Sequence, residues 1–273
     1  MSLNYNAIKK SFNKVAAHYH KNAVLQKEVL SRLLERLDDE HRIDTNLKPQ
    51  SILDLGCGIG WAYEGFKTIF PKAKITGLDF SEQMLNQIKY ESMSKVCSDA
   101  HDLPFSDNSF DIVFSNMLLH WSNESDVFNE CLRVLKPNGL LIMSCLGETS
   151  LYELKDAFKT VDNYPHVHSF PALHELGDEM LKKGFQQVVV NAEVLTLTYE
   201  NIIKLMKDIK ASGGHNVEEK RIKSLKTRQY LKNLSQAYEV YREDNRLPAS
   251  YEIVYLRGLK PKLKGDIGLT IQN

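Results

Sequence analysis

The stretch Ile52-Leu53-Asp54-Leu55-Gly56-Cys57-Gly58-Ile59-Gly60 predicts a β-strand that runs directly into a glycine-rich turn and then a helix. A dinucleotide-binding fingerprint, Gly-x-Gly-x-x-Gly, would need glycine at position 61, where the chain has Trp61. The pattern is instead Asp-x-Gly-x-Gly-x-Gly, with an acid before the glycines. The carboxylate of Asp54 would repel a pyrophosphate, whereas it suits a cationic ligand. Glycine allows the backbone to approach such a ligand closely.

Short apolar runs alternate with amphipathic segments on both sides of this turn. Strands are expected at 51–55, 74–78, near 96, and at 110–115, 140–145, 185–198 and 251–256. Helices are expected at 5–17, 22–38, 62–69, 82–90 (capped by Ser81), 123–135, 150–161, 172–182, 199–211 and 222–243. The alternation predicts an α/β fold, a doubly wound and mostly parallel seven-stranded sheet with helices on both faces.

The domain organisation follows from these elements. We expect an N-terminal helical lid at 1–48, an α/β domain at 49–258 and a flexible tail at 259–273. A helical insertion at 199–246 would lie before the last strand.

Composition narrows the class of protein. The 273 residues hold 35 basic and 35 acidic side chains, and no apolar run approaches the roughly 20 residues of a membrane span. No secretory signal follows Lys9 and Lys10, and the four cysteines form no CxxC pair, so we expect reduced thiols in a cytoplasmic protein. Zero net charge and the lack of a basic-aromatic motif argue against nucleic-acid binding.

Two further acids follow predicted strands. Asp79 ends the second strand, where it could accept hydrogen bonds from two ribose hydroxyls, and Asp99 follows the third, near where an adenine amino group would lie. Because the carboxyl ends of parallel strands meet at one edge of a sheet, Asp54, Asp79 and Asp99 should lie along one ligand-binding edge.

Together these residues resemble the class I S-adenosylmethionine-dependent methyltransferases over about residues 50–146, which implies a Rossmann-like fold and S-adenosylmethionine as co-substrate. The resemblance implies cofactor contacts from the glycine motif, the ribose acid with its neighbours, the adenine-edge pair and the loop that faces the methyl group: Asp54, Gly56, Gly58, Gly60, Asp79, Phe80, Met84, Asp99, Ala100 and Asn116. The turn at 133–139 also resembles that of the family.

The flanking segments resemble the malonyl-acyl-carrier-protein O-methyltransferases of biotin synthesis. The matching stretches lie at 12–26, 115–121, 205–216 and 251–255, with Gly214 in place of an expected Ala and His120 where some members have Gln. The resemblance implies methylation of the free carboxylate of a malonyl thioester on an acyl carrier protein. It makes the insertion at 199–246 the acceptor side.

A carboxylate acceptor has a simple chemical requirement. It is already an anion at pH 7, so it needs alignment and a cation or donors rather than a general base. His120 is the one candidate catalytic side chain, and Tyr19, Lys210 and Arg228 are candidate acceptor contacts. Each has a plainer interpretation: Tyr19 as lid packing, His120 as a loop histidine that donates to the backbone, and both cations as solvated groups.

Other interpretations stay open at this level. His166, His168 and His174 lack a ligand-completing carboxylate or cysteine, so no metal site is expected. A methyltransferase that acts on another small molecule, such as a quinone precursor, and a non-catalytic cofactor-binding assembly factor are the alternative functions.

Charge is unevenly distributed along the chain. Residues 1–36 hold seven Lys or Arg and two Glu, a net charge of +5, and residues 199–232 hold nine basic and four acidic groups, again +5. Residues 37–198 hold thirteen basic and twenty-four acidic groups, a net charge of −11. An acidic carrier protein would therefore have to approach through the two basic segments.

Overall fold

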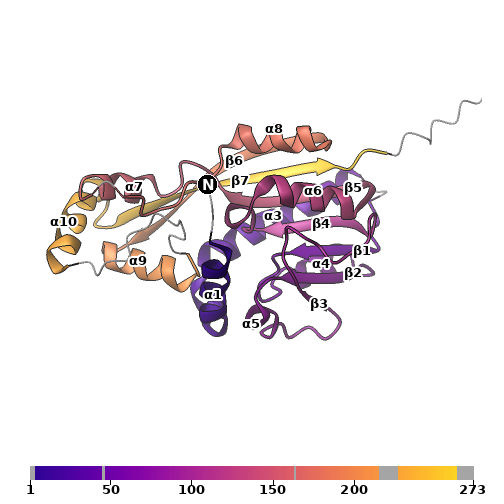
Figure 1. Ribbon diagram of the computed structural model, residues 1–273, viewed down its shortest axis with the longest axis horizontal. Coiled ribbons are helices and arrows are strands. Elements are labelled where there is room, and N and C mark those ends of the chain that lie inside the picture. Colours follow the sequence, from indigo (N-terminus) through magenta and orange to yellow (C-terminus); the bar gives the residue numbers. More distant parts are fainter. Residues whose placement is uncertain (1–3, 45–46, 163, 215–226, 263–273) are drawn as a thin grey trace, which may run out of the picture.

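The structure is a computed structural model that describes residues 4–44, 47–162, 164–214 and 227–262. Within these residues seven strands form a sheet in the order β3-β2-β1-β4-β5-β7-β6 (Figure 1). In chain order the strands are β1 (Ser51–Leu55), β2 (Lys74–Asp79), β3 (Ser94–Cys97), β4 (Phe110–Asn116), β5 (Leu135–Leu146), β6 (Gln186–Tyr199) and β7 (Leu247–Leu259). Strands β1 to β5 pair in parallel, and β7 runs antiparallel to β5 and β6. The predicted fold class is confirmed.

Helices cover both faces of this sheet. They are α1 (Tyr5–Val15), α2 (Tyr19–Asn22), α3 (Val24–Ile43), α4 (Tyr63–Ile69), α5 (Glu82–Leu85), α6 (Glu124–Val134), α7 (Tyr152–Lys159), α8 (Leu173–Lys183), α9 (Ile202–Ala211) and α10 (Arg228–Tyr238). Alternate residues of each central strand point to opposite faces. Ile52 therefore packs in the cluster with α3 and α4, whereas Leu53 packs in the cluster with α6 and α8.

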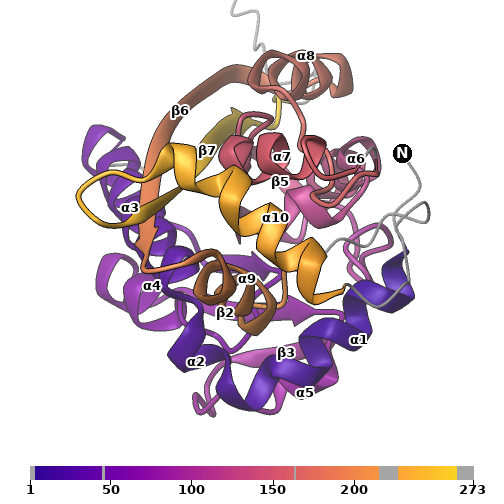
Figure 2. The same cartoon turned by 90° about the vertical axis from the view of Figure 1, so that its left-hand side faces the viewer.

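The site end of the molecule lies beyond the carboxyl ends of the parallel strands. In Figure 1 the arrowheads of β1 and β4 point toward the end where α1 lies, and β6 and β7 extend to α7, α9 and α10. Figure 2 shows that end face on, with α9 and α10 across the middle and α1 and α2 below them. Both basic segments of the sequence therefore contribute helices to this end.

Helix α1 connects the two parts of the site end. The Ser81 hydroxyl, at the start of α5, donates to Asn13 Oδ1 at 2.6 Å, and the Ser11 hydroxyl donates to the carbonyl oxygen of Gly213, just after α9, at 3.1 Å. A Cβ atom at Gly213 would lie 2.8 Å from the Phe12 ring, so this contact needs glycine. Helix α1 thus spans from the start of α5 to the end of α9.

Several predicted elements have different bounds in the structure. The helix expected at 82–90 ends at Leu85, because the chain turns there and buries Ile88 beside Gly60. The cap by Ser81 is present, with Ser81 Oγ accepting the Met84 N–H at 3.2 Å. The helix expected at 22–38 continues to Ile43 as α3, and the one expected at 222–243 lies partly outside the described residues and is α10 over 228–238.

No helix in the described parts of the chain is long and apolar enough to cross a membrane.

Candidate active site

The glycine turn folds back against the end of β2. The N–H groups of Gly56 and Cys57 both donate to the carbonyl oxygen of Leu78, at 2.8 and 3.0 Å. Gly56, Gly58 and Gly60 have φ angles of 72°, 54° and 79°, a region that favours glycine. A Cβ atom at Gly56 would lie 2.3 Å from the Leu118 side chain, whereas one at Gly58 would meet no atom within 4 Å. The backbone at Gly58 therefore faces open space that a ligand can approach.

Asp79 has hydrogen-bonding capacity left for a ligand. Its Oδ2 accepts the Gly58 N–H at 2.9 Å and its Oδ1 accepts the Ser81 N–H at 2.8 Å. Burial raises the pKa of Asp79 to about 6, although these two hydrogen bonds lower it. Each oxygen keeps a lone pair, so a pair of ribose hydroxyls can donate to it.

Asp54 lies below the turn as a buried acid. It is 2% exposed, and its Oδ2 is a buried oxygen with no hydrogen-bond partner. Burial, and then the negative charge of Asp79, raise the pKa of Asp54 to about 8. An unpartnered buried carboxyl group of this kind fits a cationic ligand, because the cation would favour its ionised form.

The loop after β3 carries the third acid. His101 donates to Asp99 Oδ1 from its backbone N–H at 2.9 Å and from ring Nδ1 at 2.5 Å, and its Nε2 accepts the Asn123 N–H at 2.9 Å. Partial burial opposes ionisation of Asp99, but the hydrogen bonds from His101 outweigh it and lower the pKa of Asp99. The Tyr5 ring of α1 packs edge-on against the His101 ring, with ring centroids 4.9 Å apart.

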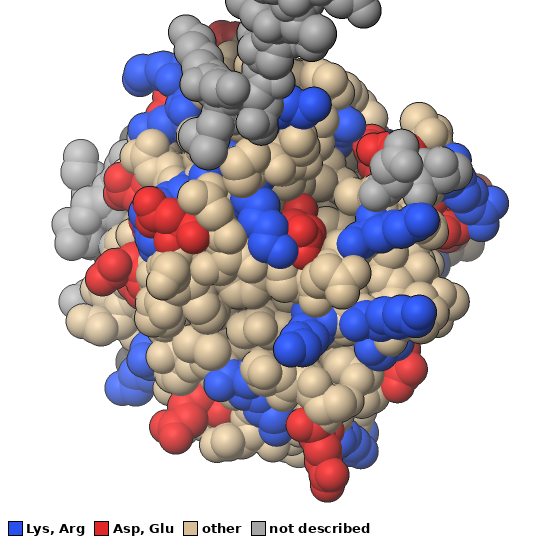
Figure 3. Space-filling view, turned by 90° about the vertical axis from the view of Figure 1, so that its right-hand side faces the viewer, with Lys and Arg blue, Asp and Glu red and all other residues tan. Residues whose placement is uncertain are grey.

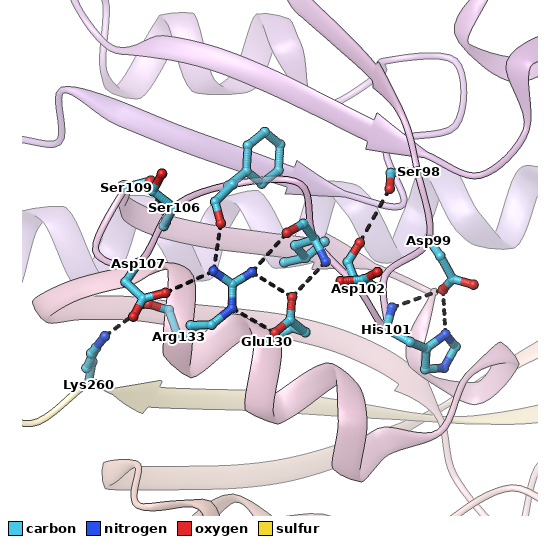
Figure 4. Close-up of polar contacts among 12 residues, drawn as sticks. Ser98, Asp99, His101, Asp102, Ser106, Asp107, Ser109, Glu130, Arg133 and Lys260 are labelled. Atoms are coloured by element: carbon cyan, nitrogen blue, oxygen red, sulfur yellow. Dashed lines mark hydrogen bonds and ion pairs between the residues drawn. The ribbon is translucent and has the colours of Figure 1, made fainter.

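Arg133 on α6 holds this loop in place (Figure 4). Its guanidinium donates to the carbonyl oxygens of Leu103 and Phe105 at 2.9 and 2.6 Å. The guanidinium also donates two hydrogen bonds to the Glu130 carboxylate in a bidentate pair, at 2.8 and 2.7 Å. The same carboxylate accepts the Leu103 N–H at 2.7 Å. The planar guanidinium suits such a set of acceptors, so Arg133 fixes the segment that follows Asp99 and Ala100.

The cofactor edge and the acceptor side share one cavity of about 380 Å³. Eight predicted cofactor contacts line it: Gly56, Gly58, Asp79, Phe80, Met84, Asp99, Ala100 and Asn116. Its far part is lined mainly by apolar side chains of β5, α7, β6, β7 and α9, which include Leu146, Leu154, Phe158, Leu197, Met206 and Tyr251. We call the part at the strand ends the cofactor half, and the part under α7 and α9, where Asp208 and Lys210 lie among apolar side chains, the apolar half.

The predicted acceptor contacts divide into two groups. Tyr19, His120 and Lys210 line the cavity, and among the described residues Lys210 has no ion-pair partner. Tyr19 stacks on Trp61 with ring centroids 5.4 Å apart, and burial, then the charge of Asp79, raise its pKa, so the hydroxyl is neutral. Arg228 is exposed at the start of α10 and lies outside the set of cavity-lining residues.

His120 makes its backbone contact in the opposite sense to the one considered from sequence. Its Nδ1 accepts the Leu146 N–H at 3.3 Å rather than donating to a carbonyl group. Burial, and then the charge of His168, lower the pKa of His120 well below its usual value. The ring is therefore neutral at pH 7.

Asp54 and Gly60 also lie outside the lining set, directly behind the turn that forms the cavity wall. A Cβ atom at Gly60 would lie 3.2 Å from Ile88. These two predicted cofactor contacts therefore do not line the cavity, and Asp54 could act on a bound cation only through its charge.

Several polar lining residues were not predicted from the sequence, and Gln26 and Asp208 are two of them. The side-chain Oε1 of Gln26, on α3, is buried and has no hydrogen-bond partner. The backbone carbonyl oxygen of Gln26 accepts a hydrogen bond from Asn116 Nδ2 at 3.0 Å. Asp208 of α9 accepts from the Tyr199 hydroxyl at 2.7 Å. Both residues belong to stretches with family resemblance, which was the available signal, but nothing in the sequence places Asp208 beside Tyr199.

The histidine-rich segment is part of the same wall. His166 Nε2 lies 2.6 Å from Asp162 Oδ1. The His166 ring stacks on the Phe158 ring, with ring centroids 4.0 Å apart. The Tyr230 hydroxyl of α10 donates to Asp162 Oδ2 at 2.7 Å. In the described parts of the chain no group of three or more His, Cys, Asp or Glu residues is placed to hold a metal ion.

Comparison with known proteins shows the family of the chain. Residues 53–143 match the family described as "Methyltransferase domain". The chain is 36% identical to the malonyl-[acyl-carrier protein] O-methyltransferase of Methylovorus sp. over 94% of its own length and 89% of that protein. It is 38% identical to the protein of the same name from Gallionella capsiferriformans, over 93% and 90%. The chain belongs to the malonyl-[acyl-carrier protein] O-methyltransferase family.

The fold of this family member agrees with a solved structure. The YcgJ protein of Bacillus subtilis superimposes with a TM-score of 0.58 at 19% identity, over 85% of this chain and 99% of that one. As the family requires, the residues present fit S-adenosylmethionine: Asp79 has lone pairs for ribose, Gly58 faces open space, and Asp54 is a buried acid without a partner whose ionised form a nearby cation would favour.

Proposed function

We propose that this protein transfers the methyl group of S-adenosylmethionine to the free carboxylate of a malonyl thioester on an acyl carrier protein, an early step of biotin synthesis. The observation that carries the proposal is the match to relatives of that name over 93–94% of the chain. The match includes the acceptor-side helix α9 as well as the cofactor edge. It therefore bears on the acceptor and not only on the cofactor.

The cofactor half would orient the methyl donor. Asp79 would accept from the ribose hydroxyls, Asp99 and Ala100 would border the adenine, and the backbone at Gly58 would lie against the ligand. When bound, S-adenosylmethionine supplies an electrophilic methyl group on a sulfonium. An attacking carboxylate oxygen takes that methyl group as the carbon–sulfur bond breaks, and the products are a methyl ester and S-adenosylhomocysteine.

The acceptor half would align the carboxylate and exclude water. No proton has to leave the acceptor, so its needs are an anion-binding group and an apolar wall. Lys210 supplies a cation at the cavity, and Tyr19 supplies a neutral hydroxyl. Arg228 stays a proposed acceptor contact only for the approach of the carrier protein, because it lies outside the cavity lining.

The domain assignment gains a functional meaning from this geometry. We take residues 1–48 as a lid whose first helix, α1, contacts both the start of α5 and the end of α9. Helices α9 and α10 of the segment 199–246 would form the acceptor-side wall. Of the tail expected at 259–273, Leu259 instead ends β7 and Lys260 pairs with Gly139, whereas residues 263–273 lie outside the described residues.

An acceptor screen tests the proposal. The protein is incubated with methyl-labelled S-adenosylmethionine and one acceptor at a time: malonyl-acyl carrier protein, malonyl-CoA or a quinone precursor. Label on the malonyl carrier is the expected result. Label only on the quinone precursor would support the alternative small-molecule methyltransferase, and tight cofactor binding with no labelled acceptor would support a non-catalytic assembly factor.

A further inference from the structure

The His120 ring is fixed in one tautomer by its contact with the backbone. A backbone N–H can only donate, so Nδ1, which accepts the Leu146 N–H at 3.3 Å, carries no proton. The single proton of the neutral ring is therefore on Nε2.

The surroundings of the ring favour this neutral form. His120 is 6% exposed, and the rings of Trp121 and Phe170 pack against it with centroids 5.1 and 5.9 Å away. Among the described residues, His168 is the titratable group whose charge acts on His120, and it opposes a second positive charge there. Protonation of Nδ1 would also break the hydrogen bond from Leu146.

The remaining polar atom of the ring is accessible to a ligand. No hydrogen bond among the described residues uses Nε2, and Nε2 is not one of the fully buried atoms that lack a partner. His120 lines the cavity where the cofactor half, with Asn116, meets the apolar half, with Leu146 and Phe170. We infer that the His120 Nε2–H binds the acceptor carboxylate as a hydrogen-bond donor and that His120 is not a general base.

The inference rests on the proposed function, because it takes the acceptor to be a carboxylate. A base needs a lone pair that faces the acceptor, and the only lone pair of this ring at nitrogen faces the backbone of Leu146. A donor to an anion strengthens its hold on the acceptor without any proton transfer. A glutamine side chain could present its amide N–H₂ group near the place of Nε2, which agrees with the Gln expected at this position in some members of the family.

Two substitutions separate the donor role from a packing role. The glutamine amide that H120Q introduces reaches about as far as Nε2 and replaces the donor. The shorter asparagine amide that H120N introduces reaches only as far as Nδ1, so it keeps an acceptor for the Leu146 N–H and loses the donor to the cavity. With malonyl-acyl carrier protein as substrate, kcat/KM should stay within about threefold of the wild type in H120Q and fall about 10- to 100-fold in H120N, the effect of one charge-assisted hydrogen bond.

Three further readouts keep the test decisive. Calorimetric affinity for S-adenosylhomocysteine should be unchanged in both variants, and wild-type turnover should show no solvent deuterium isotope effect. Nitrogen-15 NMR of labelled histidine should show His120 protonated at Nε2 and unprotonated at Nδ1. Equal activity of H120N and H120Q, a proton on Nδ1, or an isotope effect that H120Q abolishes would overturn the inference.

Failure of the proposed function would look different. In that case the wild type would leave malonyl-acyl carrier protein unmethylated while it methylates another acceptor. The NMR result would still decide the tautomer, and an unprotonated Nε2 would contradict the donor role whatever the acceptor is.

Discussion

Two buried carboxylates, Asp54 on β1 and Asp79 at the end of β2, lie beside the glycine turn. Asp79 is held by two backbone N–H groups, whereas Asp54 keeps an oxygen without a partner. The same turn needs glycine at Gly56, because a Cβ atom there would lie 2.3 Å from Leu118. We therefore expect cofactor binding to depend on these two buried acids.

Replacement of Asp79 by Ala should weaken cofactor binding. The change removes two charge-assisted hydrogen bonds to ribose, each worth about 1.5–3 kcal/mol, so affinity measured by calorimetry should fall at least tenfold. Because Ala also leaves the Gly58 and Ser81 N–H groups without their acceptor, D79N serves as the isosteric control. Unchanged affinity in a folded D79N or D79A protein would contradict the assignment of the turn.

Binding of S-adenosylmethionine should release a proton from Asp54. With a pKa of about 8 in the free protein, Asp54 is mostly protonated at pH 7. A cation bound nearby would lower that pKa, so about one proton should leave on binding. Calorimetry in two buffers of different ionisation enthalpy measures this number, and D54N should abolish it.

The same shift predicts how the stability of the free protein changes with pH. Because the folded state holds a proton on Asp54 that the unfolded state loses near its ordinary pKa of 3.8, the contribution of Asp54 falls as the pH rises from about 4 to 8. The wild type should lose stability relative to D54N over that window in denaturant titrations. An opposite trend would show that Asp54 is ionised in the free protein.

At the scale of elements, the site depends on contacts between segments that are distant in the chain. Helix α6 holds the adenine-side loop through Arg133, and α1 spans from α5 to the end of α9. The Arg133 contacts thereby fix the segment that follows the third acid, Asp99.

Substitution of Arg133 by Lys should loosen the loop after Asp99. A lysine cannot reproduce the fork to Glu130 together with the two carbonyl contacts. Since the guanidinium is partly exposed, we expect a loss of only about 1–2 kcal/mol in the free energy of unfolding, with cofactor affinity a few-fold weaker. Arg242 is a matched control, because it forms a similar fork to Glu239 three residues away but lies far from the loop in sequence. R242K should leave cofactor affinity unchanged, and equal losses of affinity in both variants would refute the anchoring role.

The sequence was sufficient to predict most elements, and the exceptions have physical causes. Strand-helix alternation is a local signal, so β1, β2, β4 and helix α4 lie close to their expected bounds. The helix expected to reach residue 90 ends at Leu85 because tertiary packing buries Ile88 beside Gly60. Local periodicity could not predict that contact.

The lining of the cavity was predictable where a motif fixed the position of each residue. The glycines and acids of the turn follow from spacing, and eight of the ten predicted cofactor contacts line the cavity. The acceptor side was harder, because the tautomer of His120 depends on the distant Leu146 and the place of Asp208 depends on Tyr199. The exposed position of Arg228 outside the cavity depends on how α10 packs, which the sequence does not encode locally.

At the scale of the whole molecule, the charged side chains at the site end can be compared with those at the opposite end. The opposite end from α9 and α10 carries basic and acidic side chains interspersed (Figure 3). At the site end, Lys204 forms an ion pair with Glu200 at 2.6 Å, Lys207 is exposed, and Lys210 lines the cavity. The basic residues at 220–226 lie outside the described residues.

Salt should affect the carrier-bound substrate more than malonyl-CoA. An acidic carrier protein would be attracted to the basic helices, and exposed charges act mainly on the rate of encounter. Between about 0.05 and 0.5 M salt the Debye length shrinks severalfold, so kcat/KM for malonyl-acyl carrier protein should fall steeply. Turnover of malonyl-CoA should fall less, because CoA lacks an extended acidic surface.

A pair of charge reversals localises this effect. Lys204→Glu with Lys207→Glu on α9 should harm the carrier-bound reaction selectively. Lys72→Glu with Lys74→Glu is the matched control, since both are exposed at the start of β2, on the opposite edge of the sheet from the site. If the two double variants behaved alike, or if both substrates lost activity equally, the basic segment would be an ordinary solvated face.

The position of the transferred methyl group tests the central claim most directly. Malonyl-acyl carrier protein is methylated with labelled cofactor, and the purified product is treated with mild alkali. Because a methyl ester hydrolyses under these conditions, the account predicts that the label is released as volatile methanol. Label that stays on the product after alkali would mean methylation at nitrogen or carbon and would contradict the assignment of a carboxylate acceptor.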